Sequence, residues 1–157
     1  MDSNSNESVD SLEERPKKSI SDLARDLAAA TLTPTARWLG KIGVSANTVT
    51  VFALIFNALG GAVLALGRFQ LGAVLVAVGG MLDGLDGLLA RVSQKMSPFG
   101  AFLDSVLDRW SEVLAFLGLL IWYARSGSVL EIILIYLALA SSLLVSYTRA
   151  RAEGVGA

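Results

Sequence analysis

The feature that most constrains this sequence is the stretch from Ile42 to Gly67, which contains no charged residue. A helix needs about 20 mainly apolar residues to cross a bilayer, so this stretch is long enough to span one. Three further apolar stretches follow, from Phe69 to about Ala90, from Pro98 to Ala124 and from about Val129 to Arg149. We therefore predict an all-α membrane protein with four transmembrane helices.

Helix-start signals support these boundaries. Ser45 and Asn47 are good N-cap residue types at the start of the first span. Ser97 followed by Pro98 is typical of a capping hydroxyl before a proline at the first helical position. The links between spans are short, so consecutive helices are expected to run antiparallel.

The residues before the first span divide into two parts. Residues 1–19 are polar and rich in Ser, Asn and Glu, which predicts a disordered cytosolic tail. Residues 20–41 predict an amphipathic juxtamembrane helix, with Leu23 and Leu27 on its apolar side and Arg25 and Arg37 toward lipid headgroups. An ordinary tether before the membrane domain of residues 42–157 is the alternative.

The distribution of Lys and Arg predicts the orientation. With a cytosolic N-terminus, eleven of the 13 basic residues lie on or near the cytosolic side, and only Arg68 and Arg125 lie outside. Cytoplasmic loops of membrane proteins carry this excess. We expect a multi-pass protein of the cell membrane with both termini in the cytoplasm.

Composition narrows the chemistry. Charged residues make up 17% of the chain and the net charge is −1, so the strong basic excess of a nucleic-acid binder is missing. There is no Cys and no His. Any metal must therefore take oxygen ligands, which favours a hard ion such as Mg²⁺, with Mn²⁺ as the alternative.

Four aspartates lie inside the second and third apolar stretches, where a charge costs about 2.5–3.5 kcal/mol even on a lenient scale. At about 100° per residue, Asp83 and Asp86 share one helix face with Gly87 and Ala90, opposite a leucine face. Asp104 and Asp108 likewise share a face of the next span. Because these helices are joined by a short link, their acidic faces can meet near the cytosolic end, at headgroup depth.

Facing carboxylates repel one another and need cations. Two divalent ions about 3.5–4 Å apart would neutralise them and leave positions open for phosphate oxygens, as in two-metal phosphoryl transfer. A cation or proton transporter is the rival interpretation, because acidic residues within a membrane also mark ion pathways.

The spacing of the acidic residues resembles the signature of the CDP-alcohol phosphatidyltransferases, Asp-Gly-x2-Ala-Arg-x8-Gly-x3-Asp-x3-Asp with a further Asp three residues before its first. Every defining position is matched, by Asp83, Asp86, Gly87, Ala90, Arg91, Gly100, Asp104 and Asp108. The resemblance implies metal-dependent transfer of a phosphatidyl group from CDP-diacylglycerol to a polar alcohol, with release of CMP.

The resemblance also implies roles for single residues. Asp83, Asp86 and Asp104 would bind two metal ions, and Asp108 would be the general base and contact one metal. The CDP moiety would be bound by Gly87, Arg91, Ser97 and the segment Asn47, Thr48, Val49 and Thr50.

The acceptor is predicted from the end of the fourth span. Residues 146–153 resemble phosphatidylinositol-phosphate synthases, in which basic residues at the positions of Arg149 and Arg151 contact the phosphate of inositol phosphate. Glycerol 3-phosphate is the alternative acceptor, and positive-inside anchoring is the alternative role of the two arginines. The family normally has six membrane helices, so the resemblance predicts that residues 42–157 form a catalytic domain lacking the last two. A truncated, inactive membrane scaffold is therefore a further hypothesis.

Two other features have structural interpretations. Arg109 and Glu112 are expected to form an ion pair. The glycines of the first two spans are expected to be small-residue contacts between helices, and they could also form a homodimer interface.

Overall fold

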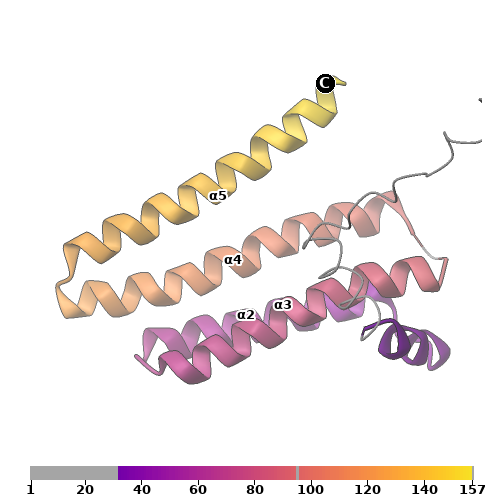
Figure 1. Ribbon diagram of the computed structural model, residues 1–157, viewed down its shortest axis with the longest axis horizontal. Coiled ribbons are helices and arrows are strands. Elements are labelled where there is room, and N and C mark those ends of the chain that lie inside the picture. The colour runs from indigo at the N-terminus through magenta and orange to yellow at the C-terminus, as the bar shows by residue number, and fades with distance from the viewer. Residues whose placement is uncertain (1–31, 95, 157) are drawn as a thin grey trace, which may run out of the picture.

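The computed structural model of the protein describes residues 32–94 and 96–156, and these residues include no strand. The predicted tail over 1–19 and the first part of the predicted juxtamembrane helix lie outside the described residues. Residues 32–41 are helical. Four long helices follow, α2 (Ala46–Ala65), α3 (Phe69–Val92), α4 (Pro98–Ser126) and α5 (Val129–Val155), as Figure 1 shows. The predicted all-α class is confirmed.

The helix boundaries follow local signals. Ser45 is the N-cap of α2, and its hydroxyl accepts a hydrogen bond of 3.1 Å from the Thr48 amide. Ser97 caps α4 in the same way, through a 2.9 Å bond from the Gly100 amide, with proline at the start of the helix. Gly67 and Gly127 adopt positive φ angles of 75° and 71° in the turns after α2 and α4, a conformation that glycine adopts without strain.

Three of the four predicted spans, α2, α3 and α5, are long and apolar enough to cross a membrane. α4 has 29 residues, but it carries several charged side chains and does not meet the same apolar criterion. Four of its charged residues, Asp104, Asp108, Arg109 and Glu112, lie in the half that also holds the candidate site, and Arg125 lies at the other end. Many large apolar side chains are exposed on the helix surfaces, as expected where lipid rather than water is the solvent.

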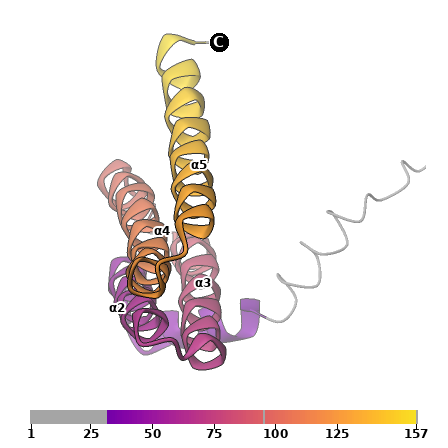
Figure 2. The same ribbon diagram turned by 90° about the vertical axis from the view of Figure 1, so that its left-hand side faces the viewer.

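The helices pack around α2, which contacts both α3 and α4. α3 and α4 run antiparallel, as expected, but contact each other little (Figure 1). Their side chains nevertheless meet at Asp83, Asp86 and Asp104, while each of the two backbones packs mainly on α2. Among the four long helices, α5 packs mainly on α4, and it leans away from the bundle toward its C-terminal end (Figure 2).

Close helix contacts occur at glycines, as predicted. A Cβ at Gly118 of α4 would collide with the backbone of Gly61 in α2. A Cβ at Gly60 would lie 2.7 Å from Val76 of α3, and one at Gly79 would collide with the Asn57 side chain of α2. Small residues thus let α3 and α4 approach the same central helix.

The apolar core of the site end is formed by Ala36, Val49, Leu85 and Leu89. It joins the helix over 32–41 to the start of α2 and the end of α3. Leu85 and Leu89 belong to the leucine face that sequence analysis placed opposite the aspartates. Because this face is buried against the helix over 32–41 and the start of α2, the acidic face of α3 turns toward α4.

Candidate active site

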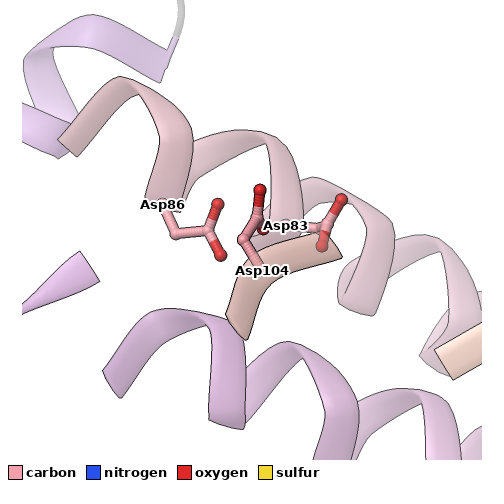
Figure 3. Close-up of side chains that lie close together, drawn as sticks. All are labelled: Asp83, Asp86 and Asp104. Carbon is pink, nitrogen blue, oxygen red and sulfur yellow. The ribbon is translucent and has the colours of Figure 1, made fainter. Parts of the chain in front are cut away.

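Three aspartates meet between α3 and α4. Asp83 and Asp86 come from α3 and Asp104 from α4, and one carboxylate oxygen of each lies within 4.8 Å of the other two (Figure 3). Asp83 and Asp86 are three residues apart and therefore project from the same side of the helix. The structure thus brings together three of the four predicted metal ligands.

Burial makes this cluster costly without a cation. Asp86 is 3% exposed, and its Oδ2 has no hydrogen-bond partner among the described residues. A buried carboxylate oxygen left without a partner costs about 1–3 kcal/mol, and two further carboxylates within a few ångströms add repulsion. An all-oxygen cluster of this kind fits a hard divalent cation, which would satisfy the unpaired oxygen and offset the negative charge.

Asp108 lies one helical turn beyond Asp104, but its carboxylate is not part of the three-oxygen cluster. It accepts a hydrogen bond from the Arg109 guanidinium instead. Asp83 and Asp108 line the same cavity, of about 370 Å³, so Asp108 borders the cluster from the side of α4 that faces α5.

A cavity of about 260 Å³ opens on the other side of the cluster. Five of the predicted nucleotide-binding residues line it: Asn47, Thr50, Gly87, Arg91 and Ser97. Two of the clustered aspartates, Asp86 and Asp104, line it as well. No atom lies within 4 Å of a Cβ built on Gly87, so this position leaves open space for a ligand beside the helix backbone. The remaining lining residues are Ala90 and Gly100, which belong to the motif, and Ala46, Met96 and Ala101, which no sequence pattern pointed to.

The cavity has the features of a phosphate site. α2 and α4 both begin at it, so Asn47 in the first turn of α2 and Ser97 at the cap of α4 line its wall. Helix N-termini carry partial positive charge and free amide groups, which attract phosphate. Arg91 adds a full positive charge from the end of α3. A phosphorylated ligand placed here would reach the metal cluster through Asp86 and Asp104.

Two residues predicted to bind the nucleotide have other contacts. The Thr48 hydroxyl lies 2.8 Å from the Ser45 hydroxyl at the helix cap. Val49 is 5% exposed and belongs to the apolar core with Leu85 and Leu89. On α2, only every third or fourth side chain can face the cavity, and the structure selects Asn47 and Thr50.

The two predicted acceptor-binding arginines lie apart from this cavity. Arg149 pairs with Glu153 at 3.1 Å on the exposed end of α5, and Arg151 is also exposed. Because α5 leans away from the bundle, its end is not packed against α2 or α3 (Figure 2).

The second cavity contains polar residues that sequence analysis did not assign to a site. Asn57, Ser111 and Ser142 line it from three different helices, together with Glu112 and Arg109. The signal in the sequence was the presence of Asn57 and Ser142 inside otherwise apolar stretches, where polar side chains need a partner.

Comparison with known proteins identifies the family. A sequence model of the CDP-alcohol phosphatidyltransferases matches residues 43–156. The chain belongs to this family. The match includes all four helices from α2 to α5 and every residue of the candidate site.

Several curated proteins are similar in sequence to this family member. The phosphatidylinositol phosphate synthase of Streptomyces avermitilis is 38% identical over 144 residues, which cover 89% of this chain and 58% of the relative. The archaetidylinositol phosphate synthase of Pyrococcus horikoshii is 36% identical, over 75% of this chain and 60% of the relative. An uncharacterised Aquifex aeolicus protein is 44% identical, over 80% of this chain and 64% of its own length. The chain spans about three fifths of the length of these relatives.

Solved structures of a phosphatidylinositol phosphate synthase from Mycobacterium tuberculosis share the fold. The structure with bound CDP-diacylglycerol matches with a TM-score of 0.74 and 34% identity, over 80% of this chain and 64% of that one. The complex with manganese and citrate matches with a TM-score of 0.70 and 34% identity, over 80% of this chain and 61% of that one. In this family member, the three-aspartate cluster offers the oxygen ligands that a divalent metal ion takes.

Proposed function

We propose that this protein transfers a phosphatidyl group from CDP-diacylglycerol to the hydroxyl group of a polar alcohol and releases CMP. The observation that carries the proposal is the contact between the three-aspartate cluster and a cavity lined by Arg91 and two helix starts. A metal site and a phosphate site that share Asp86 and Asp104 suit cleavage of a pyrophosphate. An ion pathway would need neither the arginine nor the cavity at the helix starts.

The proposed roles follow from the positions of the residues. Asp83, Asp86 and Asp104 would hold two Mg²⁺ ions, with Mn²⁺ as a substitute, and Asp108 would contact one of them through a single oxygen. When bound, the ions would polarise the pyrophosphate and stabilise the negative charge on the departing CMP. Asp108 would accept the proton of the acceptor hydroxyl while the hydroxyl oxygen attacks the phosphorus of the phosphatidyl group.

The nucleotide is proposed to occupy the 260 Å³ cavity. Arg91 and the amides at the starts of α2 and α4 would bind its phosphates, and Gly87 would leave room for the ligand beside α3. Thr48 and Val49 would contribute through their backbone, since their side chains have other contacts. The acyl chains would remain in lipid.

Inositol phosphate is the proposed acceptor, and glycerol 3-phosphate is the second candidate. The relatives named phosphatidylinositol phosphate and archaetidylinositol phosphate synthases support inositol phosphate. Arg149 and Arg151 are proposed to bind the acceptor phosphate, which would require the end of α5 to approach the site.

The protein is proposed to lie in the cell membrane with the active site facing the cytoplasm. The excess of Lys and Arg on that side supports this orientation. The glycines at the closest contacts are used within the chain, between α2 and its neighbours. A homodimer stays a prediction that the mass of the protein in detergent would test.

The test is CMP release by purified protein supplied with CDP-diacylglycerol, Mg²⁺ and one acceptor at a time. We expect release with inositol phosphate and its loss in Asp108→Asn. Glu131→Gln, which neutralises a carboxylate at the start of α5 outside the site, serves as the matched control and should remain active. A folded protein that binds Mn²⁺ but releases no CMP with either acceptor would refute the transferase and favour the scaffold.

A further inference from the structure

Arg109 connects two acidic side chains at the edge of the site. Its Nη2 donates to Oδ2 of Asp108, and its Nη1 donates to Oε2 of Glu112 at 3.0 Å. The three side chains are 35%, 41% and 22% exposed, for Arg109, Asp108 and Glu112 respectively. The expected ion pair with Glu112 is therefore present, and it is extended by a second one to Asp108.

We propose that Arg109, anchored by Glu112, is a positioning residue that holds the Asp108 carboxylate beside the metal cluster with one oxygen free. The inference rests on the proposed role of Asp108 as the general base.

The geometry of the guanidinium carries this assignment. Its donors are fixed in one plane, so binding Glu112 through one nitrogen sets the direction of the other nitrogen toward Asp108. Asp108 and Arg109 are adjacent on α4 and leave the helix about 100° apart. The Asp108 carboxylate is therefore drawn sideways, away from the three oxygens that lie within 4.8 Å of one another. Its Oδ2 accepts the bond from Arg109, so Oδ1 is the oxygen left without a guanidinium donor and is the more available one for a metal or an acceptor hydroxyl.

Charge gives Arg109 a second, separable effect. Its guanidinium lines the same cavity as Asp83, so a positive charge lies near the metal-binding carboxylates. A nearby positive charge weakens cation binding. Removal of Arg109 should therefore tighten metal binding, through the lost repulsion and through release of Asp108 toward the cluster, while it slows turnover.

The experiment compares Arg109→Gln, Arg109→Lys, Glu112→Gln and the double variant Arg109→Gln/Glu112→Gln. Arg125→Gln is the matched control, because Arg125 lies on the same helix at the opposite end and hydrogen-bonds the Ala65 carbonyl. Mn²⁺ affinity is measured by electron paramagnetic resonance, and kcat and KM are measured from CMP release.

Arg109→Gln is expected to bind Mn²⁺ about threefold to tenfold more tightly, since one nearby charge is removed. Its kcat should fall about tenfold to 100-fold, part of the 10²–10⁴ that a general base supplies. KM for CDP-diacylglycerol should not change, because Arg109 does not line the nucleotide cavity. Arg109→Lys should restore Mn²⁺ affinity, since it keeps the charge, but not kcat, since it lacks the planar fork.

Glu112→Gln should lower kcat less than Arg109→Gln does, and the double variant should be no slower than Arg109→Gln, because Glu112 acts through Arg109. The inference is overturned if Arg109→Gln keeps the wild-type kcat, or if its kcat and Mn²⁺ affinity fall together as in a folding defect. If the wild-type protein releases no CMP, the proposed function fails. The placement of Arg109 beside the aspartate cluster is then tested by Mn²⁺ binding alone. In that case weaker binding by Arg109→Gln would refute its placement beside the cluster.

Discussion

Two neighbouring glycines of α3 allow a sharp test of how the site is held together. Gly79 faces α2, where an added Cβ would lie 2.8 Å from Asn57 Cγ and 3.1 Å from the Ala53 carbonyl oxygen. Gly80 faces open space, with no atom within 4 Å of an added Cβ. The substitutions Gly79→Ala and Gly80→Ala therefore differ only in the packing they meet.

The expected magnitudes follow from these contacts. A methyl group at position 79 must displace Asn57, whose side chain donates a 2.9 Å hydrogen bond to the Ala53 carbonyl. Overpacking costs about 1–3 kcal/mol and the lost hydrogen bond about 0.5–1.5 kcal/mol. Replacing glycine by alanine inside a helix returns about 0.5–1 kcal/mol. Gly79→Ala should thus lower the free energy of unfolding by about 0.5–4 kcal/mol, and Gly80→Ala should raise it by about 0.5–1 kcal/mol.

Equilibrium unfolding in a detergent titration measures both values, and Mn²⁺ binding reports on the site. Asp83 lies one turn after Gly79, so displacement of α3 from α2 should also weaken Mn²⁺ binding in Gly79→Ala. Asn57→Ala removes the side chain that the new methyl group meets. The double variant should therefore be more stable than the sum of the single effects, by about 0.5–3 kcal/mol. Equal stability of the two alanine variants would refute the packing of α3 on α2 described here.

Three further predictions concern the site and its link. Asp104→Asn should weaken Mn²⁺ binding at least about tenfold. Because a ligand bound to the folded state stabilises it, the variant should also lose the rise in thermal stability that Mn²⁺ gives the wild type. A variant with the wild-type rise in thermal stability would refute Asp104 as a metal ligand. Arg91→Ala should raise KM for CDP-diacylglycerol about tenfold to 100-fold, because one hydrogen bond to a charged group is lost. A change in kcat without a change in KM would show that Arg91 does not bind the phosphates of the substrate. Gln94 has a φ of 53° in the link after α3. Gln94→Gly should raise the free energy of unfolding by up to about 1 kcal/mol in the same titration, and a loss of stability would count against this turn.

Much of the architecture was predictable because its causes are local. The caps Ser45 and Ser97 fix where α2 and α4 begin. The i,i+3 spacing of Asp83 and Asp86 puts both on one face of α3, and the spacing of the leucines puts them on the other. These relations depend on the helical period alone, so they hold whatever the helix packs against.

Contacts between helices were harder to predict. The short link predicted that the acidic faces of α3 and α4 could meet, but it did not predict that both helices would pack mainly on α2, where glycines at the crossings allow close approach. Val49 was expected near the nucleotide, and its side chain is instead in the apolar core. Which of several neighbouring residues faces a cavity depends on the rotation of a helix about its axis, and only its partners fix that rotation.

The sequence by itself determined that this is an all-α membrane protein of the CDP-alcohol phosphatidyltransferase family with an acidic stripe on each of two helices. Helical period and motif spacing suffice for that conclusion. Tertiary structure alone decided that Asp83, Asp86 and Asp104 meet, that Asp108 pairs with Arg109, and that the arginines of α5 lie apart. Each of these contacts requires charged groups from different positions to come within a few ångströms of each other. The packing of the helices around α2 sets those distances.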